Sequence, residues 1–318
     1  MQDRIGPSKA GPFGLLQPLA DGGKFFFKED FTPANAEKFL FILGPSLVMF
    51  ISLITGAVIP WGKSLNIGGT SFDLQVANID VGVLYIIGMA SIGVYGIMIG
   101  GWASNNKYSL LGAIRASSQM ISYELAMGLA LLSIIMMNGS LDLKVITESQ
   151  ATGKLWGLIS LDGMNWNIFY QPLAFLIFII AALAETNRHP FDLPECESEL
   201  VTGYSTEYSS MKLGLYMFGE YVNMFISNAF MVALFFGGYN YPGIEWVTQN
   251  WGENAAGILS IVAFLTKTII GILIFMWIRW TLPRFRYDQL MHLGWKTLIP
   301  LALVNLMITG ALILAFGN

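Results

Sequence analysis

Acidic side chains are concentrated in one short part of a chain that carries little charge elsewhere. Between Glu185 and Glu220 there are two cations, Arg188 and Lys212, and seven carboxylates: Glu185, Asp192, Glu195, Glu197, Glu199, Glu207 and Glu220. Like charges and partial removal from water both favour the neutral carboxylic acid, so the pKa of some of these acids is expected to rise toward neutral pH. Such acids exchange protons when a nearby charge changes. A solvated acidic loop is the alternative, and the residues alone favour it.

Three ionisable residues lie inside apolar runs, where charge is costly and commonly functional: Glu124, Glu220 and Lys267. Glu220 lies eight residues beyond Lys212, or about 12 Å along a helix, and Lys267 lies twelve residues before Arg279, or about 18 Å. A buried ion pair or hydrogen bond between helices is the structural alternative for each of the three. Lys267 in particular could simply partner a carboxylate.

The sequence has no motif for a resident metal or redox cofactor. Its one cysteine, Cys196, excludes an internal disulfide and a four-thiolate cluster. His189 and His292 have no partner at metal-ligand spacing and are interpreted as ordinary loop residues. Neither a phosphate-binding GxxxxGK[ST] motif nor a strand–GxGxxG–helix unit is present. We therefore expect no metal site and no bound cofactor in this chain.

Composition indicates that these residues are positioned by membrane helices. Of the 318 residues, 54% are hydrophobic and 12% are charged, whereas soluble domains carry about 25% charged residues. A membrane-spanning helix needs roughly 20 mostly apolar residues. Seven such runs occur, near 39–60, 82–102, 118–138, 167–185, 213–237, 257–280 and 297–316. The predicted fold is an all-α polytopic bundle, with residues 1–318 forming a single domain.

Basic residues predict the orientation of this bundle. Seven crossings place the N-terminal segment and the loops 103–117, 186–212 and 281–296 on one side. That side carries thirteen Lys and Arg residues against three on the other, with Lys267 inside a span. Because cytoplasmic loops are enriched in Lys and Arg, the acidic loop 186–212 is predicted to be cytoplasmic.

The segment 10–30 is amphipathic but too short to cross a membrane. Gln17, Asp21, Lys24 and Lys28 recur at spacings of 4, 3 and 4, and the Leu and Phe residues fall largely away from this stripe. One interpretation is a surface helix that packs on the bundle. The other is an interfacial helix that lines an opening from the lipid. The pattern favours neither.

Four long stretches resemble one known family. They are RIGPSKAGPFGLLQPLADGGKFFFKED, GWASNNKYSLLGAIRASSQMISYE, AETNRHPFDLPECESELVTGYSTEYSS and TLPRFRYDQLMHLGWKTLIPL. They resemble the H subunit of bacterial NADH:quinone oxidoreductase, a family that includes subunit 1 of mitochondrial complex I. The resemblance extends from Arg4 to the C-terminus.

The resemblance implies a function that the composition does not. It implies a proton-pumping NADH:quinone oxidoreductase subunit without cofactors of its own, in the bacterial cytoplasmic membrane. Such a subunit forms the chamber for the substrate quinone, ubiquinone or menaquinone, and couples quinone reduction to proton translocation. NADH, FMN and iron–sulfur clusters belong to partner subunits. The expected partners are the peripheral-arm quinone-site subunits, small membrane subunits, quinone and lipid, with no nucleic acid.

The resemblance also suggests roles for individual residues. The expected proton-coupling residues are Glu124, Glu185, Asp192, Glu195, Glu197, Glu199, Glu207, Glu220 and Lys267. Those expected at the quinone chamber are Arg4, Gln17, Asp21, Lys24, Arg188, Phe191 and Tyr208. Arg284, Arg286 and Asp288 are expected to dock partner subunits, although the two arginines could instead pair with the acidic loop.

The sequence departs from the family pattern at three places. Relatives have a membrane helix before the RxGP motif, whereas Met1 here lies three residues before Arg4; Lys9 stands where arginine is usual, and Cys196 where glycine is common. Two other functions were weighed: the corresponding subunit of a membrane-bound hydrogenase or of a ferredoxin- or F420H2-linked relative, and a stand-alone transporter. The absence of an internal repeat and the specific motifs count against a transporter.

Overall fold

A computed structural model describes residues 6–68, 70–152, 165–188, 190–192 and 202–316. Within this part of the chain, six helical segments are long and apolar enough to cross a membrane. They are α2 (Lys38–Thr55), α3 (Gly82–Ala103), α4 (Lys107–Asn138), α9 (Ser210–Phe235), α11 (Glu253–Thr281) and a last segment made of α12 (Tyr287–His292), the π-helical turn η4 (Leu293–Leu298) and α13 (Ile299–Phe316). A shorter apolar helix, α7 (Pro172–Glu185), follows the single turn α6 (Asn167–Tyr170). The predicted all-α polytopic bundle is confirmed.

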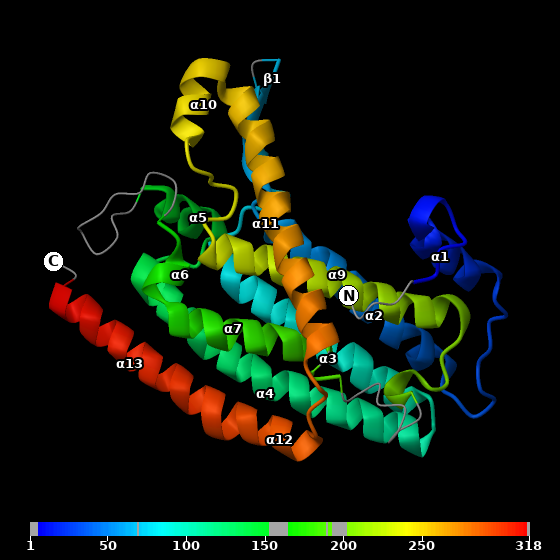
Figure 1. Ribbon diagram of the computed structural model, residues 1–318. Coiled ribbons are helices and arrows are strands. Elements are labelled where there is room, and N and C mark those ends of the chain that lie inside the picture. The colour runs from blue at the N-terminus through cyan, green and yellow to red at the C-terminus, as the bar shows by residue number, and fades with distance from the viewer. Residues whose placement is uncertain (1–5, 69, 153–164, 189, 193–201, 317–318) are drawn as a thin grey trace.

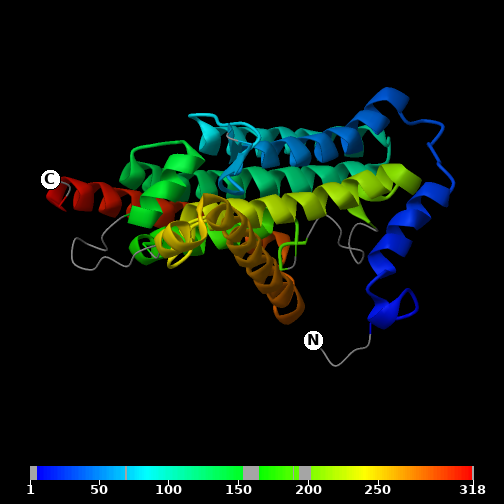
Figure 2. The same ribbon diagram turned by 90° about the horizontal axis from the view of Figure 1, so that it is seen from above.

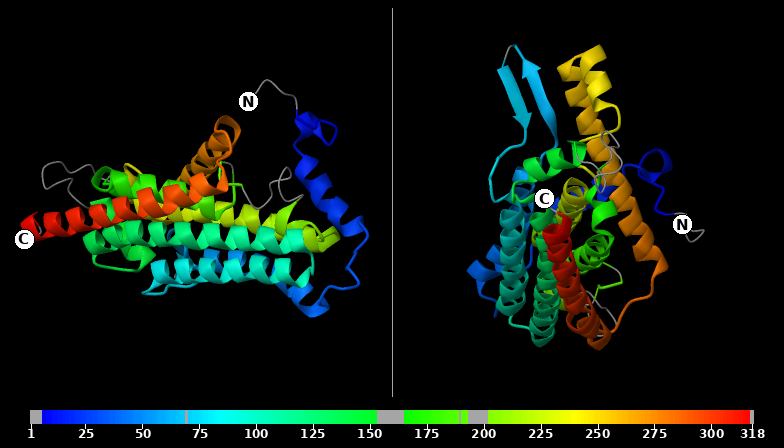
Figure 3. Two further views of the ribbon diagram at one scale, coloured as in Figure 1. Left: turned by 90° about the horizontal axis from the view of Figure 1, so that it is seen from below. Right: turned by 90° about the vertical axis from the view of Figure 1, so that its left-hand side faces the viewer.

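Most of these helices run side by side, and one crosses them. α2 packs on α3 and α9, while α4 packs on α3, α7 and α13. α11 crosses the bundle at a steep angle, which Figure 1 and Figure 2 both show. Its N-terminal end projects beyond the bundle together with a β-hairpin and the short helix α10 (Ile244–Trp251) (Figure 3).

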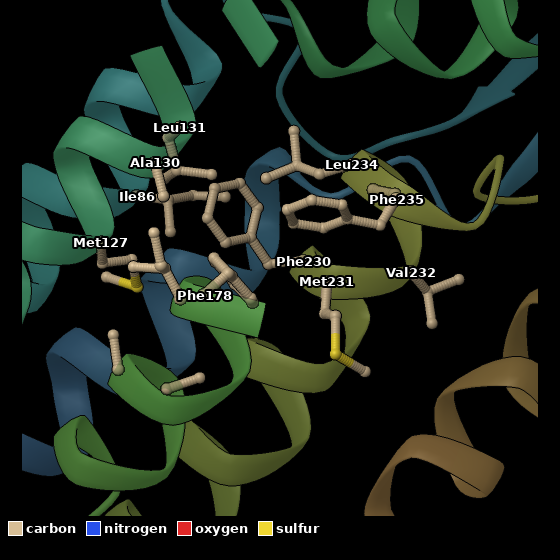
Figure 4. Close-up of a cluster of buried hydrophobic side chains, with 14 of the residues drawn as sticks. Ile86, Met127, Ala130, Leu131, Phe178, Phe230, Met231, Val232, Leu234 and Phe235 are labelled. Atoms are coloured by element: carbon tan, nitrogen blue, oxygen red, sulfur yellow. The ribbon is translucent and has the colours of Figure 1, made fainter. Parts of the chain in front are cut away.

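The short helix α7 is the centre of the hydrophobic core. Its exposed fraction is 0% at Ala174, Ile177, Phe178 and Ala182. The small alanines let α7 lie close to its neighbours. Phe178 packs against Phe230 and Phe235 of α9. It also lies near the α4 side chains Met127 and Leu131 (Figure 4). Leu176 remains half exposed, but the last five residues of α7, 181–185, are all buried, so this helix ends inside the bundle.

Gly96 and Gly100 form a notch on the surface of α3, where the absence of side chains lets two tyrosines reach the α3 backbone. The hydroxyl of Tyr216 donates to the carbonyl of Gly96 at 3.1 Å, and that of Tyr208 donates to Gly100 at 3.2 Å. A Cβ at Gly100 would collide with the Tyr216 hydroxyl. Tyr208 also stacks on Phe41, with 4.1 Å between ring centroids. The notch therefore ties the start of α9 to α2 and α3.

Several elements differ from the sequence-based expectation. α4 begins at Lys107, so the predicted span 118–138 is too short and much of the predicted loop 103–117 is helical. Asn106 caps this helix by accepting from the Tyr108 amide, which starts it before the apolar run. The loop after α2 contains the hairpin β1 (Gly62–Ile67) and β2 (Thr70–Leu74), and α5 (Leu143–Thr152) and α10 are further short elements. The hairpin pairs with α11 through Lys63 N and Ser260 Oγ at 2.9 Å, a long-range contact that local patterns do not show.

The amphipathic segment contains a 3-10 turn, η1 (Pro12–Gly14), and the helix α1 (Gln17–Phe27) at one end of the bundle (Figure 1). Its C-terminal end is attached to the start of α9: Ser210 Oγ donates to Lys28 O at 2.9 Å, and Lys212 pairs with Asp30 at 3.0 Å. The large apolar side chains of the segment remain exposed, namely Phe13, Leu15, Leu19, Phe26 and Phe27. These side chains do not pack on the described bundle, and both interpretations of the segment stay predictions.

Candidate functional site

Charged residues are buried in the turn that follows α7. Glu185 is the last residue of α7, and Glu185, Arg188 and Asp192 are each 8% exposed. The turn is closed by Arg188 N donating to Leu183 O at 3.3 Å and Phe191 N donating to Arg188 O at 2.8 Å. Asn187 adopts a left-handed conformation with φ of 49°, which asparagine tolerates better than most residues. Because α7 is enclosed by its neighbours, its final residue is held inside the bundle.

Glu220 on α9 lies beside this turn. Its Oε1 accepts from the Tyr204 hydroxyl at 2.7 Å, and its Oε2 lies 3.7 Å from Arg188 Nη2. The Arg188 guanidinium also lies over the Tyr221 ring, 4.4 Å from its centroid. Tyr204 belongs to the 3-10 turn η3 (Gly203–Ser205). Glu220 is thus partnered by residues from both described ends of the acidic loop.

One small cavity lies between Glu220 and Glu185, and a second adjoins Glu185 alone of the two acids. One, of ≈ 40 Å³, is lined by both carboxylates and by Thr186, Asn187 and Asn223. The other, of ≈ 20 Å³, is lined by Glu185, Asn223 and Ser227. A water molecule needs about 10–15 Å³ measured in this way, together with polar partners, so both cavities can hold water. Water in the first cavity would bridge the two acids.

Glu124 continues this line of acids toward α3. The Ser91 hydroxyl of α3 donates to its carboxylate, and Glu124 interacts electrostatically with Glu185. Glu124 and Ser91 also line a ≈ 500 Å³ groove between α3 and α4, whose other residues are apolar. Glu220 and Glu185 share a cavity, and Glu124 lies within electrostatic range of Glu185; we call these three acids, on α9, α7 and α4, the acid line.

A family model described as NADH dehydrogenase matches residues 1–310 of the chain. The chain belongs to the NADH dehydrogenase family. An H subunit of NADH-quinone oxidoreductase from Cytophaga hutchinsonii is 61% identical over 316 residues, covering 99% of this chain and 89% of the relative. The H subunit from Flavobacterium psychrophilum is 58% identical with the same coverage. Subunit 8 from Rhodothermus marinus is 46% identical, covering 97% of this chain and 87% of the relative. Family membership and the apolar helices together make the chain an integral membrane protein.

In this NADH dehydrogenase family member, the other described acids of the loop have partners outside the acid line. Asp192 pairs with Arg284 at 3.2 Å, joining the loop to the segment after α11. Glu207 accepts from Asn106 Nδ2 at 2.6 Å. Arg284 thus pairs with the acidic loop, and its expected role in docking a partner stays a prediction. Arg286 instead pairs with Asp288 on the surface, at 2.5 Å.

The two aromatic residues expected at the chamber are buried. Phe191, 3% exposed, lies between Tyr123 and Phe285, with 5.5 Å between ring centroids in both pairs. Tyr208 is 5% exposed, and burial raises its pKa to about 12. Its hydroxyl consequently remains a neutral donor to Gly100 at physiological pH. Both rings hold loop backbone against the helices.

Lys267 lies apart from the acid line and contacts backbone carbonyls. Its ammonium donates to Phe236 O at 2.8 Å, Gly238 O at 3.0 Å and Asn240 O at 2.5 Å. These bonds use all three donors of the lysine and lie where α9 ends, at the negative end of its helix dipole. The partner of Lys267 is therefore a helix terminus rather than the carboxylate that the sequence suggested.

Of the remaining predicted residues, three lie on α1 and the others lie outside the described part of the chain. Asp21 and Lys24 are exposed and Gln17 is half-buried; Gln17 Nε2 lies 3.4 Å and Lys24 Nζ 3.5 Å from Asp21. The residues outside the described ranges are Arg4, Glu195, Glu197 and Glu199, together with His189 and Cys196. In the described part of the chain, no three His, Cys, Asp or Glu side chains are placed to hold a metal ion.

Sequence reasoning missed the uncharged polar residues of the site. Ser91, Asn187 and Asn223 line the cavities or bind the acids, but none was singled out as a candidate. Asn223 follows Glu220 by three residues and so lies on the same helical face. Polar residues at helical spacing from a buried acid were the signal that could have found it.

We expect the Asp192–Arg284 pair to stabilise the turn after α7. Asp192→Asn and Arg284→Gln should each lower the free energy of local opening at the Phe191 amide. In the double variant this free energy should fall by less than the sum of the two single effects, with a coupling energy of about 1 kcal/mol. Hydrogen exchange of the assembled protein measures this opening. Strictly additive effects would show that the two side chains do not act as a pair.

Proposed function

We propose that the chain is the membrane subunit of NADH:quinone oxidoreductase that forms the quinone-access chamber and couples quinone reduction to proton translocation. The observation that carries this proposal is the acid line, in which Glu220, Glu185 and Glu124 connect the described ends of the acidic loop to the interior of an apolar bundle. Buried acids of this kind are costly in a membrane and are commonly parts of proton relays. Relatives named as H subunits of NADH-quinone oxidoreductase support the assembly and the substrate.

The proposed coupling follows from charge balance. A quinone takes up two electrons and two protons to become a quinol, and the electrons come from a cluster on a partner subunit. Before the protons arrive, the reduced quinone carries negative charge, which raises the proton affinity of nearby carboxylates. Protons taken up by the acidic loop, including Glu195, Glu197 and Glu199, then pass along Glu220, Glu185 and Glu124. Water in the cavity shared by Glu220 and Glu185 bridges the first of these steps.

The chamber and the docking surface are assigned to different parts of the chain. We propose that α1 lies at the membrane interface, where its exposed Leu and Phe residues contact lipid, and that Gln17, Asp21 and Lys24 face the quinone path together with Arg4 and Arg188. Phe191 and Tyr208 shape the wall of the chamber. The exposed pair Arg286 and Asp288, with Arg284 beside it, docks peripheral-arm subunits. NADH, FMN and iron–sulfur clusters lie on the partners.

Glu124→Gln tests this function at the inner end of the acid line. The amide keeps the shape and the hydrogen bond from Ser91 but carries no proton to pass on. NADH oxidation with a quinone acceptor and proton translocation in vesicles should fall about tenfold, or about 1.4 kcal/mol in barrier height, with oxidation by ferricyanide unchanged. Glu245→Gln, an exposed acid on α10, is the matched control and should behave as wild type. Normal translocation by Glu124→Gln would remove it from the proton path.

A further inference from the structure

Gln119 on α4 is a buried amide that joins the end of α7 to the loop beyond it. Its exposed fraction is 0%. Its Nε2 donates to Ala184 O at 2.9 Å and to Phe191 O at 2.8 Å. Both partners are acceptors only, so the orientation of the amide is fixed by its contacts. One nitrogen atom thereby binds the carbonyls on both sides of the six residues, 185–190, that separate Ala184 from Phe191.

The segment closed by this amide carries the charged groups of the site. Glu185 and Arg188 lie between the two bonded carbonyls, and Asn187, in its left-handed conformation, makes the bend between them. Ala184 O belongs to the last turn of α7 and also accepts from Asn187 N at 3.4 Å. Gln119 thus adds a second, shorter hydrogen bond to this helix-end carbonyl and holds the return of the chain with the same nitrogen atom.

We propose that Gln119 is the positioning residue of the acid line, because its side-chain amide fixes the turn that directs Glu185 to the cavity shared with Glu220 and Arg188 to the Glu220 carboxylate. This inference rests on the proposed function. It assigns no proton transfer to Gln119, which contacts neither quinone nor a transferred proton. Its contribution is geometric, and it requires a donor at this position rather than a side chain of a particular volume.

Gln119→Glu separates the requirement for a donor from the requirement for volume. Glutamate has nearly the shape of glutamine, but it can donate only when protonated, and then through one hydroxyl. The titratable and charged groups around it are Glu124 on α4, Glu185 on α7, Arg188 and Asp192 in the loop, Glu220 on α9 and Arg284 after α11. The wild-type protein contains all of these groups, so each result is expressed as a ratio to wild type at the same pH.

Gln150→Glu is the matched control. Gln150 on α5 is another buried glutamine whose Nε2 donates to two carbonyls, Ile146 O at 3.1 Å and Ala233 O at 3.0 Å. The Gln150→Glu substitution therefore also introduces a buried glutamate and removes a donor to two carbonyls, but it does so at the C-terminal end of α9. Effects that arise from any buried glutamate should appear in both variants.

The experiment uses the assembled complex and two measurements, hydrogen exchange of residues 184–191 and NADH:quinone turnover. For Gln119→Glu at mildly alkaline pH, exchange of the Arg188 and Phe191 amides should rise at least about fivefold, the effect of losing a typical hydrogen bond. Quinone turnover should fall with it, and both should recover toward acid pH. Gln150→Glu should leave exchange in this segment at the wild-type level.

The outcomes distinguish the inference from the function on which it rests. Unchanged exchange in Gln119→Glu would overturn the positioning role. Faster exchange with full quinone turnover would leave Gln119 as the residue that closes the turn but would contradict the proposed use of the turn in coupling. Gln119→Leu, which has no donor at any pH, should show fast exchange without recovery in acid. Recovery in that variant would also overturn the inference.

Discussion

Replacing Lys267 with methionine is expected to destabilise the assembled protein by about 3 kcal/mol or more, because three buried carbonyls lose a charged donor. These carbonyls belong to Phe236, Gly238 and Asn240, where α9 ends and the chain reverses. Methionine keeps the apolar stem of lysine without its ammonium. The amount of assembled complex in the membrane and its temperature of half-inactivation measure the loss.

Lys267→Met also distinguishes two roles of the Lys267 ammonium, capping the C-terminal end of α9 and relaying protons. Lys267→Arg keeps a cation at the helix end and should restore assembly in part, although a planar guanidinium fits three converging carbonyls less well. If Lys267→Met assembled with wild-type thermal stability and lost only proton translocation, capping would not be its main role. The relay role expected from the resemblance stays a prediction until then.

Glu185→Gln is expected to produce the largest loss of coupled activity. Among the described residues, Glu185 is the one acid that lines both cavities, and it also feels the charge of Glu124, so it is placed between the other two members of the acid line. The amide keeps the volume and hydrogen-bonding capacity, and assembly should be preserved because α7 ends with the same packing. We expect quinone-linked NADH oxidation and proton translocation to fall about tenfold or more.

Two comparisons make the result for Glu185→Gln specific. Oxidation of NADH by ferricyanide, which does not use the quinone chamber, should remain normal. Glu245→Gln introduces the same chemical change at an exposed position on α10 and should leave quinone-linked activity intact. Full translocation by Glu185→Gln would mean that protons bypass the link between the two cavities.

The membrane helices could be predicted because their signal is local. Apolar runs of sufficient length identified the helices, and the run 167–185 ended at Glu185 as in the structure. The start of α4 was misplaced because Lys107–Ser117 is less apolar, whereas the cap at Asn106 and contacts with η3 keep it helical. The hairpin β1–β2 is stabilised by α11, nearly two hundred residues away in sequence, and no local pattern shows that contact.

The candidate site was predictable in its residue types but not in its pairings. Costly charges in apolar runs pointed to Glu124, Glu220 and Lys267, yet which charge meets which group depends on how helices cross. Glu220 meets Arg188 and Tyr204, Asp192 meets Arg284, and Lys267 meets a helix end. Gln119 was invisible to a search for charge, since its importance comes from two carbonyls that lie 65 and 72 residues away along the chain.

The measurement that tests the acid line most directly is the NADH-induced infrared difference spectrum of the reconstituted complex with quinone. A buried carboxyl group that gains or loses a proton during turnover changes its C=O stretching band. The account predicts a carboxyl band in the wild-type spectrum that persists in Glu245→Gln and disappears in Glu185→Gln. An unaltered carboxyl band in Glu185→Gln, in a complex that still reduces quinone, would contradict it.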